Sequence, residues 1–272
     1  MNTIAPGIYP NISNEDYHAG PGLSSSDMKK LLRSPLHYIT AKQAPREETP
    51  AMRLGTATHC AILEPERFAA EYIQAPDLDR RTKAGKAAWA ELEAARKIIL
   101  TADEYSKAVE MSKAVREHPL AGKLFSGGIA EQSIYWEQPV GDSVILCKCR
   151  PDYVKPLNGG HVIVDLKTTR DAREHQFQKQ AFWDLGYHIS AAHYMTGFEA
   201  ATGERPSGFI FVAVENEPPY AVNIFRAGED FLASGQEKAE ETYNLYAACM
   251  ANNEWPGYPA IIQDLWLPRG TN

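Results

Sequence analysis

The sequence predicts an α/β fold in which helices flank a central mixed sheet and a mainly helical part precedes that sheet. Helical patterns and capping signals fill residues 1–125, whereas short apolar runs bounded by Gly, Pro and Asn begin near residue 129. A long helical stretch then separates three strand-like runs from two further ones. We expect a single domain over residues 1–272, with a helical N-terminal part over 1–125 and a core over 126–272.

Four helices are predicted in the N-terminal part. Ser24 to Asp27 leads into a short capped helix that Ser34-Pro35 ends. Thr101 and Glu104 form a capping box at the start of the last of the four. The expected ranges are 28–33, 54–63, 83–99 and 101–117.

The period of the apolar residues changes after residue 129, where strands are predicted. Runs over 133–137, 144–150 and 161–167 are strand-like, and the first two form a hairpin around 139–142. The third run is the most apolar, as a central strand should be. A helix over 174–202, strands over 208–215 and 220–225, and a closing helix over 229–252 complete the predicted order.

Composition narrows the class of protein. A net charge of −7 argues against a protein that coats nucleic acid indiscriminately, but it does not exclude a nuclease with a local basic path. No apolar run approaches the roughly 18 residues of a membrane helix, and no secretion signal is found, so we expect a cytoplasmic protein without a membrane partner. The spacing of the four cysteines fits neither a zinc site nor an iron–sulfur site, which predicts buried thiols.

The central chemical signal is Arg150-Pro151-Asp152, which twelve intervening residues separate from Asp165-Leu166-Lys167. On a strand, Asp165 and Lys167 face the same side. Asp152 follows the strand-like run over 144–150, and a hairpin-like return would bring it alongside. Two carboxylates supply hard oxygen ligands for Mg²⁺, and a lysine beside them can orient water or offset developing charge, as phosphodiester hydrolysis requires.

The alternative is a solvent-exposed ion pair, since the D-x-K pattern alone is weak. Asp165 ends a Val-Ile-Val run, where a carboxylate must be paired or metal-bound to offset its desolvation. This favours the metal site. His59, on a predicted helix with Gly55 one turn earlier, is either a structural residue or part of that site. The cations Arg80, Arg81, Lys83 and Lys86 indicate either a solvated helix start or a phosphate-binding loop.

Several segments, in order, resemble the nuclease domain of the RecE (exonuclease VIII) family within the PD-(D/E)xK nuclease superfamily. They are Ile12–Gly22, Leu54–Cys60, Arg80–Lys86, Ser133–Glu137, Cys147–Asp152 and Asp165–Thr169, with Glu254–Pro256 and Leu267–Arg269 near the end. The resemblance covers nearly the whole chain. It implies a restriction-endonuclease-like (PD-(D/E)xK) core.

The resemblance also implies an activity: processive 5′-to-3′ degradation of one strand of linear double-stranded DNA, which leaves 3′ overhangs. It implies Mg²⁺, with Mn²⁺ as a substitute, a ring-shaped homotetramer, and a single-strand annealing protein of the RecT type as partner in recombination. By position, Asp152, Asp165, the Leu166 carbonyl and His59 become metal ligands, and Lys167 the catalytic lysine. Glu131 is a weaker candidate for the same cluster.

The resemblance extends to DNA contacts, with one departure. Ser24 and Ser26 at a helix start and the Arg80–Lys86 segment are expected to contact DNA. Related nucleases often carry Gln-x-x-x-Tyr after the D-x-K strand, whereas here Ser190 replaces the Gln and Tyr194 keeps the Tyr. Two alternatives stay open: an endonuclease of the same superfamily, and a catalytically silent DNA-binding scaffold.

Overall fold

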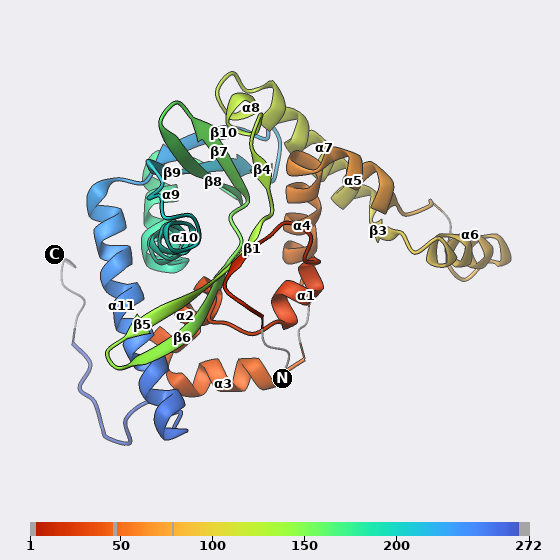
Figure 1. Ribbon diagram of the computed structural model, residues 1–272. Coiled ribbons are helices and arrows are strands. Elements are labelled where there is room, and N and C mark those ends of the chain that lie inside the picture. Colours follow the sequence, from red (N-terminus) through yellow and green to blue (C-terminus); the bar gives the residue numbers. More distant parts are fainter. Residues whose placement is uncertain (1–3, 46–47, 78, 267–272) are drawn as a thin grey trace.

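The computed structural model describes residues 4–45, 48–77 and 79–266, so the Leu267–Arg269 segment of the resemblance lies outside the described residues. A five-stranded sheet forms its centre. The strand order is β10 (Val222–Arg226), β9 (Gly208–Glu215), β8 (Gly160–Thr169), β7 (Tyr153–Leu157) and β4 (Ile129–Ala130). Only β8 and β9 run parallel, and the other neighbours are antiparallel. The predicted mixed sheet is therefore confirmed (Figure 1).

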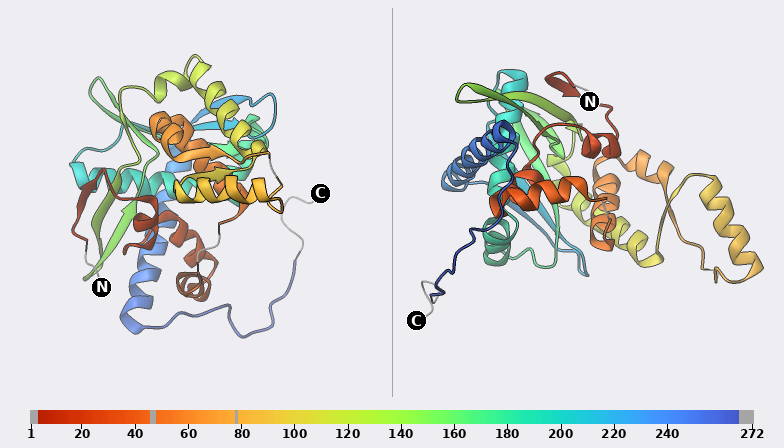
Figure 2. Two further views of the ribbon diagram at one scale, coloured as in Figure 1. Left: turned by 90° about the vertical axis from the view of Figure 1, so that its right-hand side faces the viewer. Right: turned by 90° about the horizontal axis from the view of Figure 1, so that it is seen from below.

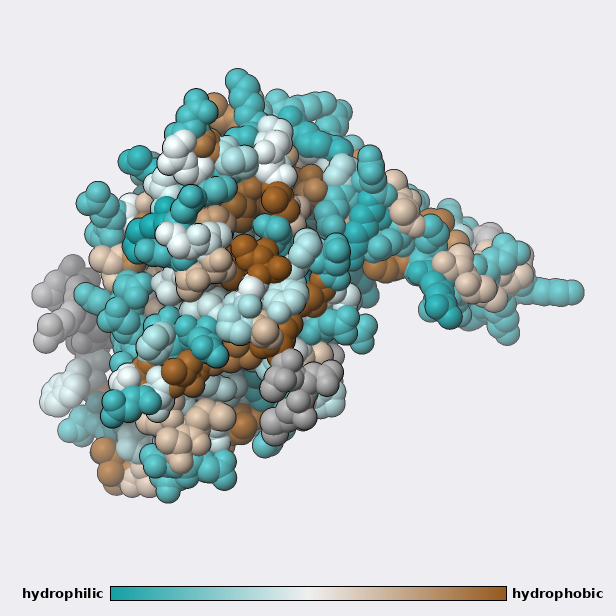
Figure 3. Space-filling view, viewed as in Figure 1, coloured by the Kyte–Doolittle hydropathy of each residue, from teal (hydrophilic) through white to brown (hydrophobic). Residues whose placement is uncertain are grey.

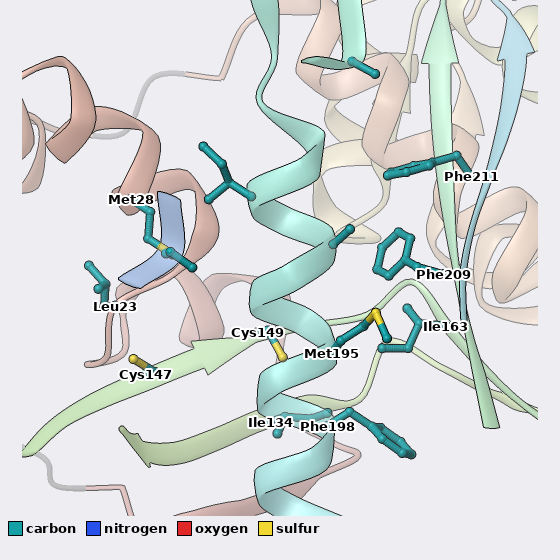
Figure 4. Close-up of a cluster of buried hydrophobic side chains, with 14 of the residues drawn as sticks. Leu23, Met28, Ile134, Cys147, Cys149, Ile163, Met195, Phe198, Phe209 and Phe211 are labelled. Atoms are coloured by element: carbon teal, nitrogen blue, oxygen red, sulfur yellow. The ribbon is translucent and has the colours of Figure 1, made fainter. Parts of the chain in front are cut away.

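Helices cover both faces of this sheet. α10 (Tyr187–Thr202) and α11 (Glu229–Asn252) lie on one side, and α4 (Pro50–Leu63) and α7 (Ala102–Glu117) lie on the other. Alternate residues of β8 enter the two cores, as the period of a strand requires. Ile163 packs with Met195 and Phe198 of α10 (Figure 4), whereas Val164 and Leu166 pack with residues of α4 and α7.

A second, smaller sheet packs against α10. It consists of β1 (Gly7–Tyr9), β5 (Ser133–Val140) and β6 (Ser143–Cys149), paired antiparallel. The predicted hairpin is confirmed, with Gly141 in the left-handed region at φ 57°. Gly197 of α10 is required at the contact, because a Cβ there would lie 2.5 Å from the Trp136 ring.

Three local predictions were wrong. The strand beside β8 is the unpredicted β7, not the run over 144–150, which belongs to the second sheet. The Ala-rich helix ends early: α6 spans Lys83–Ala94, and β3 (Ile98–Leu100) pairs with β2 (Tyr72–Gln74). The helix expected over 174–202 is broken into α9 (Glu174–Lys179), the π-helical turn η1 (Gln180–Asp184) and α10, with left-handed Gly186 before α10.

The predicted caps are confirmed at Ser24 and Thr101, which form capping boxes at the starts of α2 (Ser25–Arg33) and α7. The remaining short helices are α1 (Asn14–Ala19), α3 (Pro35–Gln43), α5 (Pro65–Glu71) and α8 (Ala121–Leu124). All four cysteines are buried and unbridged, as predicted. Within residues 4–45, 48–77 and 79–266, no helix combines the length and apolarity needed to cross a membrane.

α6 projects from the rest of the molecule. Figures 1 and 2 show it at the end of an excursion that leaves the body after α5 and returns to α7. Figure 3 shows hydrophilic and apolar residues mixed on the surface of this excursion. Because α6 projects from the body, most of its residues are exposed, in contrast to those of the helices that flank the sheet.

Candidate active site

Asp165 and Lys167 lie on the face of β8 that is turned toward α10. Their side chains form an ion pair, and Asp165 is only 2% exposed. The Lys167 Nζ atom also lies 5.0 Å from the ring centroid of Tyr187, the first residue of α10. The pair is therefore not the solvent-exposed salt bridge that was the alternative interpretation of this motif.

Asp152 reaches the same place from the position just before β7. Because Tyr153 is paired with Val164 in antiparallel register, Asp152 lies beside the next stretch of β8. Its Oδ2 atom accepts a hydrogen bond from the Leu166 backbone N–H at 2.6 Å. The expected proximity of Asp152 to Asp165 is present, but β7, which follows Asp152, provides it.

His59 enters the cluster from α4. Its Nδ1 atom lies 2.9 Å from the Gly55 carbonyl oxygen, and its Nε2 atom lies 2.9 Å from the Leu166 carbonyl oxygen and 3.2 Å from Asp152 Oδ2. Both ring nitrogens face acceptors, so both donate and the imidazole is protonated. Burial opposes this charge, but Asp152 outweighs burial and raises the pKa of His59 to about 9.

Glu131 completes the cluster from the loop between β4 and β5. It adopts the left-handed conformation at φ 52°, which is uncommon for a residue with a side chain, and its N–H donates to the Asp152 carbonyl at 3.1 Å. Burial and then the Asp152 charge raise the pKa of Glu131 to about 7. Glu131, Asp152 and His59 line a cleft of about 540 Å³ beside the N-terminal segment.

The carboxylates of the cluster repel one another. Burial raises the pKa of Asp165 to about 6, and the Asp152 charge adds to that increase. Burial also acts against the Asp152 charge, but His59 opposes it and holds the pKa of Asp152 below its usual range. Accumulated buried negative charge of this kind is what a hard cation would neutralise.

The donor set fits a divalent cation that prefers oxygen. Within the described ranges, no three His, Cys, Asp or Glu side chains are already arranged as a metal site. Asp152 is instead bonded to His59 and Leu166, and Asp165 to Lys167. The ligands available to Mg²⁺ are therefore two carboxylates and the Leu166 carbonyl, a set of hard oxygen donors.

The basic segment before and within α6 does not join this cluster. Arg81 is bonded to Asp79, and the Arg80 guanidinium lies 3.4 Å from the ring centroid of Trp89. Lys83 and Lys86 are exposed on the projecting helix. The structure thus holds these four cations together on the excursion, away from β8 (Figure 2).

The remaining predicted contacts divide into two kinds. Ser24 is buried and its hydroxyl donates to Asp27 Oδ2 at 2.7 Å, so it serves the helix cap, while Ser26 beside it is exposed. Tyr194 lines the cleft with Asp152, whereas Ser190 is buried in α10. Two residues that the sequence patterns did not single out, Lys29 and Tyr187, lie beside Lys167.

The fold and the Pro-Asp…Asp-x-Lys residues together define a domain of the PD-(D/E)xK type. The family model described as "PDDEXK-like domain of unknown function (DUF3799)" matches residues 24–263. This match spans most of the chain, and the chain belongs to that family. No curated protein matches the sequence significantly.

One of three similar solved structures supports the fold. A putative exonuclease from Eubacterium rectale is similar with a TM-score of 0.57 at 14% identity, over 92% of this chain and 96% of that chain. A phage related exonuclease from Haemophilus somnus 129PT has a TM-score of 0.34 at 13% identity, over 86% of this chain and 97% of that chain. An alkaline exonuclease from Laribacter hongkongensis gives 0.30 at 15% identity, over 73% and 96%. Only the first score is high enough to support a common fold.

Proposed function

We propose that this chain is a Mg²⁺-dependent exodeoxyribonuclease. The observation that supports it best is the convergence of His59, Asp152, Asp165 and Lys167 from three elements on one edge of β8. Buried charges are costly unless they are paired or bind a ligand, so such a set suits a catalytic centre better than a passive surface. Membership of the PDDEXK-like family supports the same activity.

The proposed roles follow from the contacts. Asp152, Asp165 and the Leu166 carbonyl would hold the metal. His59 would orient Asp152 and that carbonyl, or would lose a proton and bind the metal itself. When bound, Mg²⁺ would polarise the phosphoryl oxygen and acidify a water molecule. Lys167, held between Asp165 and the Tyr187 ring, would stabilise charge on the phosphate and orient the attacking water. Glu131 would accept a proton or hydrogen bond in the cleft.

The finer activity is proposed from the family resemblance of the sequence. We propose that the chain is one exonuclease domain that degrades the 5′ strand of linear double-stranded DNA processively, leaving 3′ overhangs for strand annealing with a RecT-type protein. Mn²⁺ would substitute for Mg²⁺, and a tetrameric ring would keep an acidic protein on its DNA. Tyr194, Ser26 and the Arg80–Lys86 segment would contact the DNA, and Ser24 would order the helix that carries Ser26.

The test is digestion of linear duplex DNA labelled separately at its 5′ and 3′ ends, beside a closed circle, in Mg²⁺ and in EDTA. The proposal predicts early loss of the 5′ label from linear DNA alone, and no loss in EDTA. Cutting of the circle would replace the exonuclease with an endonuclease. DNA binding that weakens with salt, without digestion in Mg²⁺ or Mn²⁺, would leave a DNA-binding scaffold protein and overturn the proposal.

A further inference from the structure

A second ammonium group lies beside the Asp165–Lys167 pair. Lys29 extends from α2, and its Nζ atom is 5.4 Å from the ring centroid of Tyr187. The Lys167 Nζ atom is 5.0 Å from the centroid of the same ring. Two segments far apart in the sequence thus place cations on one aromatic side chain beside Lys167.

The side-chain stem of Lys29 packs against the turn that precedes α10. The side-chain stem passes Gly186, where a Cβ would lie 3.7 Å from the Lys29 Cγ and Cδ atoms. Gly186 itself adopts the left-handed conformation at φ 57°, which glycine accepts readily. The apolar stem of Lys29 therefore packs on the turn between η1 and α10, and its ammonium group faces the Tyr187 ring.

Within the part of the chain that the structure describes, Lys29 forms no ion pair. No carboxylate of residues 4–45, 48–77 and 79–266 lies within ion-pair distance of it, whereas the next residue, Lys30, lies 3.9 Å from Asp27. Burial and then repulsion by Lys167 lower the pKa of Lys29 to about 8. The Asp165 carboxylate acts in the opposite direction on this pKa, but it is already paired with Lys167. Two ammonium groups thus lie near the Asp165 carboxylate at this end of the cluster, and an anion beside Lys29 would stabilise the second of them.

We propose that Lys29 binds a backbone phosphate of the DNA strand that is cut, next to the phosphate held at Asp165 and Lys167. This inference rests on the proposed nuclease function and adds a substrate-binding residue to it. An ammonium on a flexible stem suits a phosphate as a point charge. The competing explanation is that Lys29 only covers Gly186 and Tyr187 with its stem.

The variant Lys29→Met separates these explanations, because methionine keeps an unbranched apolar stem and removes the charge. The affinity of labelled linear duplex DNA is measured by fluorescence anisotropy at several KCl concentrations, with Ca²⁺ in place of Mg²⁺ to prevent digestion. Loss of one phosphate contact should lower the slope of log affinity against log salt by about 0.9. Lys29→Arg should keep the slope, and Lys29→Met should raise KM for DNA more than it lowers kcat.

Lys30→Met is the matched control, since it removes the neighbouring charge on the same helix. Its slope should stay near that of the wild type. An unchanged slope in Lys29→Met, or an equal decrease in both variants, would overturn the inference while the nuclease function stands. Wild-type protein that neither binds nor digests duplex DNA would overturn the proposed function and this inference with it. If Lys29→Met is poorly folded, Lys29→Gln serves as the uncharged variant against Lys29→Arg.

Discussion

Charged side chains gather in two regions of the molecule, the cluster on β8 and the basic segment at α6. In the cluster, His59, Asp152 and Asp165 come from positions far apart in the chain and are bonded to one another or to Lys167 and Leu166. In the segment, Arg81 is bonded to Asp79, two residues away, and the neighbouring lysines face solvent.

The two regions differ in whether their charged side chains are buried or exposed. Buried charges cost several kcal/mol each unless partners or ligands stabilise them, so their convergence from distant elements indicates chemistry. Exposed cations on a projecting helix cost little and are suited to a polyanion through long-range attraction. The two regions should therefore respond differently to substitution, the first in the chemical step and the second in DNA affinity.

A large loss is expected at Lys167, second only to the complete loss expected at Asp165. Lys167→Met removes the ammonium between Asp165 and Tyr187 and should lower kcat by about 10²–10⁴-fold. Single-turnover digestion of linear duplex measures this, with Lys179→Met on α9 as the surface control. Digestion at the wild-type rate by Lys167→Met would remove the distinction between the two regions.

A smaller loss is expected at His59, which orients the groups around the metal. His59→Gln should lower the affinity for Mg²⁺ or the digestion rate by roughly 10–100-fold, because residues that orient metal ligands typically contribute that much. The dependence of the digestion rate on Mg²⁺ concentration measures it. Met52→Leu on the same helix is the control, because its side chain is exposed and does not line the cleft, and it should leave that dependence unchanged.

The basic segment should affect affinity rather than chemistry. Replacing Lys83 and Lys86 together by Gln should lower the salt slope of DNA binding by about 0.9 for each phosphate contact that is lost. Arg81→Gln should change it less, since Asp79 already offsets its charge. A decrease in the single-turnover rate at saturating DNA, with unchanged affinity, would contradict this assignment.

A second buried histidine, His193, lies outside the candidate site and provides a contrast to His59, because burial keeps it neutral. It donates from Nε2 to the Lys148 carbonyl and accepts from Tyr243 at Nδ1. Burial lowers its pKa from 6.5 to about 4. Between pH 6.5 and 4, His193 therefore binds a proton in the unfolded chain but not in the folded chain. The free energy of unfolding falls as the pH falls through this range.

The expected loss is roughly 3 kcal/mol over that range. Urea unfolding at several pH values measures it. His193→Gln should flatten this pH dependence, whereas His175→Gln, an exposed control, should not. If the variant with Gln at 193 keeps the full pH dependence, another group is responsible for it.

The fold was predictable where local signals were strong. The capping boxes at Ser24 and Thr101 and the apolar run of β8 are encoded within a few residues. β7 was missed because Pro156 interrupts a short run, and the end of α6 was missed because β3 is fixed by pairing with distant β2. The break near Gly186 was hidden by a continuous helical period.

The candidate site was predictable only in part for the same reason. The period of a strand places Asp165 and Lys167 on one face, and this follows from the sequence alone. The approach of His59 to Leu166 depends on how α4 packs against β8, which no local pattern encodes. Lys29 and Tyr187 belong to different elements, so their meeting at Lys167 required the tertiary structure.

The most direct test of the account is digestion of linear duplex DNA in Mg²⁺ by Asp165→Ala, beside the exposed control Asp184→Ala. Circular dichroism of both variants checks that the fold is intact. We predict complete loss of metal-dependent digestion in Asp165→Ala and wild-type digestion in Asp184→Ala. Retained digestion by folded Asp165→Ala would contradict the assignment of a nuclease centre to β8.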